Sequence, residues 1–272
     1  MDLFRAAVLG IVQGLSEFLP ISSSGHLILV PALFRWPDQG LAFDVGLHGG
    51  TLAALLAYFW RDWYVMFRAA GQDALAGRVR PRRWSEPTRL LAYLALGSVP
   101  AAVTGLLLQG TIEANLRQPW LVAILLAVVA TIMLAADRAT RARRDLPDVT
   151  TRDAVLVGVA QAFALFPGVS RSGATISMAL FRNFTRDASA RFAFLLGTPA
   201  FVGALILEAP DLANASGRYE EVVVGFASSM LVGFAVIYAL LRFLRTRTLM
   251  TFVVYRYAVA VVTLAIGAAR VA

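Results

Sequence analysis

The side chains of this sequence that are best suited to chemistry lie in two related segments, residues 10–25 and 158–173. The first segment carries Glu17 and Ser23 and is followed directly by His26, and the second carries Arg171. A serine hydroxyl can act as a nucleophile, an imidazole or a carboxylate can hold and move protons, and a guanidinium matches phosphate oxygens. These residue types together indicate a site for a phosphorylated substrate.

The two segments are copies of one phrase. Without gaps, six residues of the first copy recur in the second: Gly10, Gln13, Phe18, Ser22, Ser24 and Gly25 match Gly158, Gln161, Phe166, Ser170, Ser172 and Gly173. The copies differ where Glu17 aligns with Leu165 and where Ser23 aligns with Arg171. A duplicated scaffold has therefore kept a carboxylate in one half and a guanidinium in the other, which predicts one shared site.

The composition places this site in a membrane. The chain has 272 residues, of which 58% are hydrophobic, and its mean hydropathy is +0.68, so an ordinary soluble domain is excluded. Six apolar runs are each long enough to cross a hydrocarbon core of about 30 Å: residues 43–60, 90–109, 119–136, 190–208, 222–243 and 252–269. The alternating pattern of a membrane barrel is not seen. There are no cysteines, so disulfides and thiolate metal sites are excluded.

Both copies of the phrase interrupt an apolar segment. Pro20 and the serine run 22–24 break the first segment, and Pro167 with Gly168 breaks the second. Neither leg is long enough to span well alone, and irregular backbone at membrane depth must be buried in protein or line a cavity. We therefore predict two re-entrant helical hairpins, at residues 3–35 and 154–183, whose tips meet near the midplane.

Loop charges support this arrangement. The formal charge is +8, and all 25 basic residues are arginines that cluster between the apolar spans. Such clustering disfavours binding to nucleic acid, which needs a basic recognition element. With both hairpins re-entrant, more arginines fall on one side than if the hairpins crossed the membrane, as the positive-inside rule requires. The termini are then outside and the loops 61–89 and 137–153 are cytoplasmic.

Three full spans follow each hairpin, and this odd number inverts the second half relative to the first. The predicted fold is an all-α integral membrane protein with an inverted-topology repeat, six full spans and about ten helices. The first repeat covers residues 1–136 and the second covers 154–272, with a cytoplasmic linker at 137–153. Further glycines agree with duplication, because Gly97 and Gly105 recur as Gly225 and Gly233.

Each hairpin offers a helix start that can bind an anion. Free backbone N–H groups and the helix dipole favour phosphate there, and serine hydroxyls add donors. The candidate substrate-binding residues are Gln13, Ser22, Ser24, Gly25, Ser170, Ser172, Gly173 and Thr175. The alternatives remain open at this point: the serines can simply cap their helices, and Arg171 can form a structural salt bridge with Glu17.

Three other polar residues, Asp44, His48 and Arg256, lie in or at the start of apolar segments outside the duplicated phrase. Asp44 and His48 lie four residues apart, so a metal or proton role is conceivable, although an interfacial helix start with a satisfied histidine explains them. Arg256 lies inside the last span, and we interpret it as structural, a partner for a helix end.

The phrases GIVQGLSEFLPISSSGH and FPGVSRSGAT resemble the two signature motifs of undecaprenyl-diphosphate phosphatases, the bacitracin-resistance family. The resemblance extends to FDVGLHGGTLAALLAYFWRDW at 43–63 and FAFLLGTPA at 192–200. It implies removal of the terminal phosphate from undecaprenyl diphosphate, which regenerates the lipid carrier for cell-wall synthesis. By motif, Glu17, Ser23, His26 and Arg171 match the family's catalytic residues. At the position of Gln13 the family shows either Glu or Gln. Because this sequence has Gln there, it lacks a second carboxylate beside Glu17.

The resemblance also implies a divalent cation, Mg²⁺ or Ca²⁺, with Glu17 as its protein ligand. It implies a polyprenyl diphosphate substrate and a site in the bacterial inner membrane that opens to the extracytoplasmic side. The sequence does not decide between a monomer and a homodimer, or between attack by Ser23 and attack by water that His26 activates. The competing function is a transporter or flippase that moves a phosphorylated lipid or solute without hydrolysis, since inverted repeats and broken helices also occur in transporters.

Overall fold

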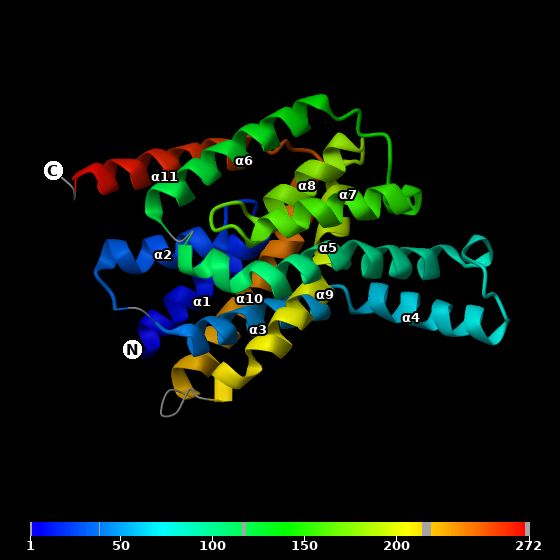
Figure 1. The fold of residues 1–272 in the computed structure, drawn as a ribbon, viewed down its shortest axis with the longest axis horizontal. Coiled ribbons are helices and arrows are strands. Elements are labelled where there is room, and N and C mark those ends of the chain that lie inside the picture. The colour runs from blue at the N-terminus through cyan, green and yellow to red at the C-terminus, as the bar shows by residue number, and fades with distance from the viewer. Residues whose placement is uncertain (1, 38, 116–117, 214–218, 270–272) are drawn as a thin grey trace.

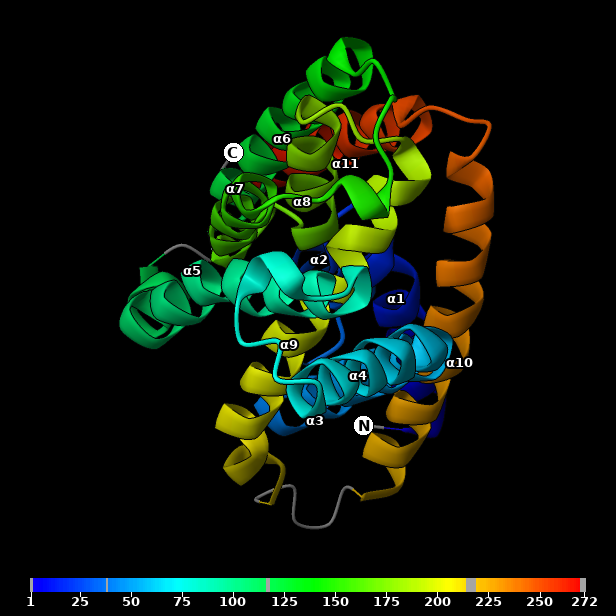
Figure 2. The same cartoon turned by 90° about the vertical axis from the view of Figure 1, so that its right-hand side faces the viewer.

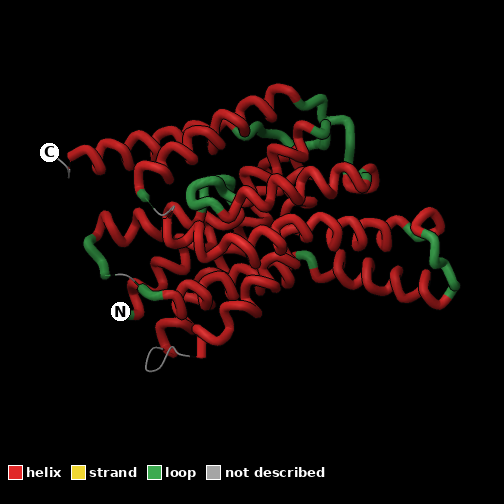
Figure 3. The backbone as a smooth tube through the Cα atoms, in the orientation of Figure 1, coloured by secondary structure: helices red, strands yellow, loops and turns green. Residues whose placement is uncertain are grey.

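The chain folds entirely into helices joined by short connections over the residues described by the computed structural model, which are 2–37, 39–115, 118–213 and 219–269 (Figures 1 and 3). Eleven α-helices cover these ranges: α1 Leu3–Phe18, α2 Ser23–Phe34, α3 Leu41–Tyr58, α4 Trp60–Leu75, α5 Glu86–Asn115, α6 Pro119–Ala139, α7 Thr151–Ala162, α8 Arg171–Phe181, α9 Arg186–Ala213, α10 Tyr219–Leu244 and α11 Met250–Ala269. The predicted all-α fold is confirmed.

Both apolar segments break where the sequence predicts. In the first, Leu19 is extended before Pro20, as proline requires of its neighbour, and α2 begins three residues later. In the second, α7 runs into a short 3₁₀ turn at Phe163–Leu165, and Gly168 then turns the chain with a φ of 94°. A side chain at such a φ is strained, which explains a glycine after Pro167.

Within the described ranges, five helices are long and apolar enough to cross a membrane, namely α3, α5, α6, α9 and α10. They correspond to five of the six predicted spans. The sixth, α11, is apolar over the shorter described stretch Met250–Ala265. The chain is therefore a multi-pass membrane protein, while its division at 136 and 154 stays a prediction.

Helix α4 is the main departure from the prediction, which assigned residues 61–89 to a loop. It continues α3 after a kink at Phe59, and α5 returns alongside it, so the two helices project together from the body of the molecule (Figure 1). Figure 2 views the same pair from its projecting end. The charged composition of 61–89 hid an amphipathic helix, whose Met66 is buried against the core. At its end, Asp73 accepts hydrogen bonds from Ser85 and Arg78, and the Ser85 N–H above all holds the pKa of Asp73 at about 2.

The two halves pack against each other through equivalent helices. Helix α1 lies along α10, and α7 lies along α5. In the first contact, a methyl group on Gly10 would collide with Ser228 and with the backbone of Gly225. In the second contact, a methyl group on Gly158 would collide with the backbone of Gly97. The glycines that recur between the halves are thus the points where the broken segments approach the long helices most closely.

We expect Gly158→Ala to lower the free energy of unfolding by roughly 1–3 kcal/mol, because the added methyl group forces α7 away from the Gly97 carbonyl. Thermal unfolding in detergent, followed by circular dichroism, measures the change. The control is Gly71→Ala in α4, where an added methyl group meets no atom within 4 Å. Equal unfolding midpoints for the two variants would contradict the assignment of Gly158 as a helix crossing.

Candidate functional site

Both broken segments open onto one cavity of about 570 Å³. Helices α1, α2, α3, α5, α7, α8 and α9 contribute to its wall. One part of the wall is polar and includes Glu17, Ser22, Ser23, Ser24, His48, Gln161, Ser170 and Arg171. The rest is formed mainly by small and apolar residues of α5 and α9, from Ser98 to Leu106 and from Pro199 to Leu207, and Glu208 follows these on α9. A polar end joined to an apolar channel suits an amphiphilic ligand.

Glu17 and Arg171 meet on this wall. Arg171 Nη2 donates to Glu17 Oε1 at 3.3 Å, and both side chains are largely buried. The other carboxylate oxygen, Oε2, accepts from Gln13 Nε2 at 3.0 Å. The acid of one half and the cation of the other therefore form a single buried pair. This pair requires contact between the two chain breaks, residues 19–22 and 163–170, which we call the two elbows.

The position of Arg171 is fixed by α9. Its guanidinium carbon lies 3.8 Å from the centre of the Phe201 ring, a cation–π contact. One of its terminal nitrogens occupies the space that a side chain at Gly197 would fill. The FLLGTPA phrase thus supplies a glycine that makes room for the guanidinium and, further along, an aromatic face that orients it.

The two helix starts have matching backbones. Ser22 and Ser170, which are equivalent in the duplicated phrase, both have positive φ values, 77° and 70°. Such a conformation is uncommon for serine and is maintained only where the surroundings enforce it. Ser170 Oγ accepts from the Gly173 N–H, whereas Ser22 makes no capping bond to its helix. Ser172 Oγ donates to the Leu19 carbonyl at 3.1 Å and so ties the second elbow to the first.

Several predicted site residues lie behind the wall and not on it. Gln13 is fully buried and supports Glu17. Thr175 donates to the carbonyl of Arg171 and belongs to the helix that carries it. Gly25 and Gly173 are buried in the first turns of α2 and α8. These four residues, like Ser172, position the site, while the serines 22–24 and Ser170 face the cavity.

His26 is directed away from Ser23. Its Nδ1 lies 2.7 Å from the Ser22 carbonyl, and its Nε2 lies 2.7 Å from the Tyr255 hydroxyl, whose ring stacks on the imidazole. A carbonyl only accepts, so Nδ1 carries the proton and the Nε2 lone pair accepts from Tyr255. Among the described residues, both ring nitrogens of His26 are thus bonded to groups other than the Ser23 hydroxyl. Tyr255 was not predicted, since nothing in the sequence links α11 to α2.

His48 does lie on the cavity wall. Its Nδ1 donates to the Asp44 carbonyl, one helical turn earlier, and its ring packs against Phe201. The sequence interpretation of His48 as a satisfied histidine at a helix start accounts for one ring nitrogen but did not foresee its place beside the site.

Arg256 holds both elbows from behind. It is fully buried in α11, and within the described part of the chain its guanidinium donates to backbone carbonyls. Nη1 reaches Pro20 in the first break at 3.3 Å, Nη2 reaches Gly168 in the second at 2.8 Å, and Nε reaches Leu126 in α6. The interpretation of Arg256 as a partner for helix ends is confirmed, and it serves two ends at once.

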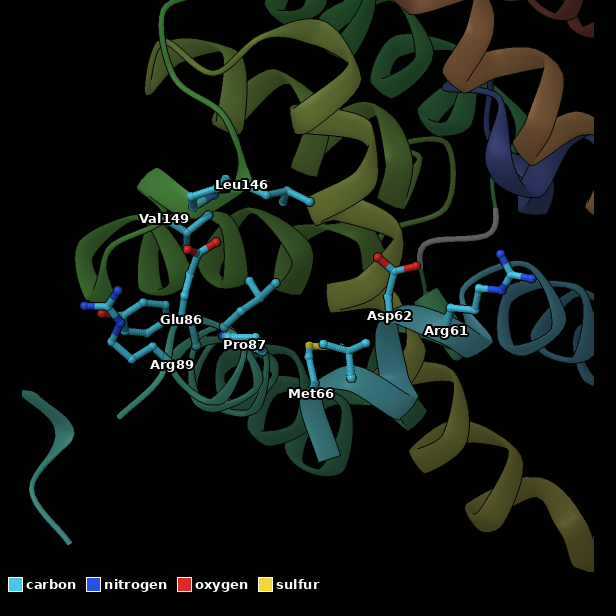
Figure 4. A pocket seen from close by; sticks show the side chains of 12 residues that line it. Arg61, Asp62, Met66, Glu86, Pro87, Arg89, Leu146 and Val149 are labelled. Carbon is cyan, nitrogen blue, oxygen red and sulfur yellow. The ribbon is translucent and has the colours of Figure 1, made fainter. Parts of the chain in front are cut away.

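A second, smaller cavity of about 320 Å³ lies between α4, α5 and the segment around Leu146 (Figure 4). Its charged residues are of both signs, with Glu86 extending from α5 towards Val149. Among the described residues, none that lines this cavity has a buried side-chain polar atom without a partner. The chemistry of the chain is concentrated at the first cavity.

Comparison with known proteins agrees with this geometry. The family model described as bacitracin resistance protein BacA matches residues 6–262. This chain belongs to the BacA family. Relatives named undecaprenyl-diphosphatase include those of Geobacter sulfurreducens, 46% identical over 94% of this chain and 95% of the relative. That of Pelotomaculum thermopropionicum is 42% identical over 99% of this chain and 98% of the relative.

The donor set of this BacA-family member limits how a metal could bind. Among the described residues, no group of three or more histidines, cysteines or acids is arranged to hold an ion. Two carboxylates line the cavity, Glu17 and Glu208. Glu17 is paired with Arg171, whereas Glu208 is distant from that pair. Arg171 contacts Gly197 of α9, and Glu208 lies about 16 Å further along the same helix. This set fits a cation that keeps water and takes phosphate oxygens from the substrate, and it does not fit a cation enclosed by protein ligands.

We expect Arg256→Met to lower the free energy of unfolding by roughly 2–5 kcal/mol, because it leaves the carbonyls of both elbows buried without a donor. Arg242→Met is the matched control, since Arg242 is exposed and its guanidinium donates to the exposed hydroxyl of Tyr238. Thermal unfolding of the two variants in detergent measures the difference. The role of Arg256 as the clamp of both breaks fails if the two midpoints agree.

Proposed function

We propose that this protein hydrolyses undecaprenyl diphosphate to undecaprenyl phosphate and inorganic phosphate in the bacterial inner membrane. This reaction recycles the lipid carrier for cell-wall polysaccharide synthesis and confers resistance to bacitracin. The observation that carries the proposal is the buried Glu17–Arg171 pair at the polar end of a cavity whose other walls are apolar. The undecaprenyl-diphosphatase names of the relatives favour hydrolysis over transport.

Arg171 would bind the terminal phosphate. Its Nη2 is paired with Glu17, while Nε and Nη1 are buried without a partner. An unpaired buried guanidinium nitrogen is costly, and a phosphate oxygen supplies the missing acceptors. The starts of α2 and α8 line the same cavity with the serines 22–24 and Ser170. Backbone N–H groups there would stabilise charge that develops on the phosphate oxygens.

Two routes for the attack follow from the same geometry. In the first, Ser23 Oγ attacks the terminal phosphorus, the bond to the bridging oxygen breaks, and undecaprenyl phosphate leaves; water then hydrolyses the phosphoserine. In the second, water attacks directly and Ser23 donates a hydrogen bond. The Ser23 side chain makes no hydrogen bond within the described part of the chain, so its hydroxyl is available for either role. His26 Nε2 can accept the proton of Ser23 or of the attacking water only after its hydrogen bond with the Tyr255 hydroxyl is broken.

A divalent cation, Mg²⁺ or Ca²⁺, belongs to the proposal. Glu17 would hold it together with oxygens of the diphosphate, and the cation would neutralise charge on the leaving group. The cavity opens to the extracytoplasmic side in this proposal, in agreement with a positive-inside orientation of the loops 61–89 and 137–153.

We expect Ser23→Ala and Arg171→Ala each to lower kcat for phosphate release from a polyprenyl diphosphate by roughly 10²–10³-fold, because each removes a group that acts on the transferred phosphoryl. Thr131→Val, on the exposed face of α6, is the control and should retain wild-type turnover. Near-normal turnover by Arg171→Ala would reject the phosphate-binding role. Acid quench followed by mass spectrometry distinguishes the two routes, since only attack by Ser23 leaves phosphate on that residue.

We also expect a chelator to abolish phosphate release by the wild-type protein, with full recovery on addition of excess Mg²⁺ or Ca²⁺. The physical reason is that Arg171, which is already paired with Glu17, cannot by itself neutralise the charge of a diphosphate. The measurement is released phosphate with EDTA, with EDTA plus excess cation, and without either. Undiminished turnover in EDTA would remove the cation from the proposal.

A further inference from the structure

Gln161 is buried on the wall of the main cavity, and its side chain has no hydrogen-bond partner among the residues that the structure describes. Its side chain is 2% exposed, it lies on α7, and neither its amide nitrogen nor its amide oxygen is paired. Native proteins pair nearly all buried polar atoms, because each unpaired one costs stability. A glutamine left unpaired at both amide atoms therefore requires an explanation.

The duplicated phrase shows how this arises. Gln13, the equivalent residue of the first half, donates to Glu17 one helical turn later. The residue one turn after Gln161 is Leu165, which also lines the cavity and offers no acceptor. The second half has thus kept the glutamine although it lacks the carboxylate that binds it in the first half.

The unpaired buried atoms gather at this site. Within the described part of the chain, eight buried side-chain polar atoms lack a partner, and five of them belong to Gln13, Gln161 and Arg171. Gln161 and Arg171 both line the cavity, together with serine hydroxyls from both elbows. Amide and guanidinium N–H groups are hydrogen-bond donors. The oxygens of an ionised phosphate are acceptors, so a phosphate group can pair with these donors.

We propose that Gln161 is a substrate-binding residue whose amide nitrogen donates to an oxygen of the diphosphate beside Arg171. Its amide oxygen can accept from a protonated phosphate oxygen or from water that accompanies the substrate. The assignment rests on the proposed phosphatase function and extends it by one residue. It gives the second half two diphosphate ligands, Gln161 and Arg171, opposite Glu17 of the first half.

The test is Gln161→Leu, which keeps the approximate volume of the side chain and removes the amide. We expect kcat/KM for a polyprenyl diphosphate to fall roughly 10- to 100-fold, the effect of losing a hydrogen bond to a charged group. The thermal unfolding midpoint should stay the same or rise, because an unpaired buried amide has been replaced by an apolar group. A structural role for Gln161 predicts the opposite, a lower midpoint.

Ser189→Ala is the matched control. Ser189 Oγ is also buried and unpaired, but Ser189 does not line the cavity, so this variant should keep both kcat/KM and stability. The isosteric Gln161→Glu provides a second test that does not depend on how leucine packs. It replaces donors by a carboxylate, so kcat/KM should fall at least as far and fall further as the pH is raised.

Binding separates this proposal from the proposed function. A polyprenyl methylenediphosphonate, which cannot be hydrolysed, should raise the unfolding midpoint of the wild-type protein and raise that of Gln161→Leu much less. If the wild type binds this analogue but releases no phosphate from the natural diphosphate, the phosphatase proposal fails and the Gln161 assignment is judged on binding alone. Wild-type kcat/KM together with wild-type stabilisation by the analogue in Gln161→Leu would overturn the assignment.

Discussion

The architecture depends on one buried cation that bonds to backbone carbonyls. Chain breaks inside an apolar bundle leave carbonyl groups without partners, and neither water nor lipid is available to pair them. Arg256 supplies donors to both breaks and to α6 from a single planar group. A lysine has a compact ammonium and could not span both sites in this way. By satisfying these carbonyls, Arg256 stabilises the two breaks whose serines 22–24 and Ser170 line the cavity.

The two copies of the duplicated phrase share a backbone framework but differ in the side chains that they bring to the site. Equivalent glycines set the close packing of α1 on α10 and of α7 on α5, and equivalent serines adopt the same positive φ at the two helix starts. On this common framework Glu17 aligns with Leu165, and Ser23 aligns with Arg171. Because the elbows touch, the acid and the guanidinium become a pair. Substitution at two positions of a duplicated phrase has thus produced an acid, a hydroxyl and a cation within one cavity.

Placement of the site inside the bundle also gives a reason for the shape of the cavity. The polar residues lie at the elbows, and small and apolar residues of α5 and α9 form the remaining wall. A lipid diphosphate is divided in the same way into a polar and an apolar part, because an anionic head group is attached to a hydrocarbon chain. Burial would strengthen the proposed attraction between Arg171 and phosphate oxygens, since the surroundings screen charge weakly.

The sequence by itself determined the fold class, the two breaks and the residues that could act. Apolar runs of span length, proline and glycine at the breaks and an aligned repeat are local signals, so no tertiary information was needed for them. The amphipathic helix α4 was missed because its charged residues resemble those of a basic loop. Gln161 was aligned but not selected, since an unpaired amide is visible only when its surroundings are known.

Tertiary structure alone decided which of the candidate residues face the substrate. It placed Gln13, Ser172 and Thr175 behind the wall, turned His26 towards Tyr255 and brought His48 and Phe201 to the cavity. It also brought Arg256 of α11 to two breaks that precede it by 236 and 88 residues. Contacts of this kind depend on how helices cross, and helix crossing is set by side-chain packing over the whole bundle, which no single segment encodes.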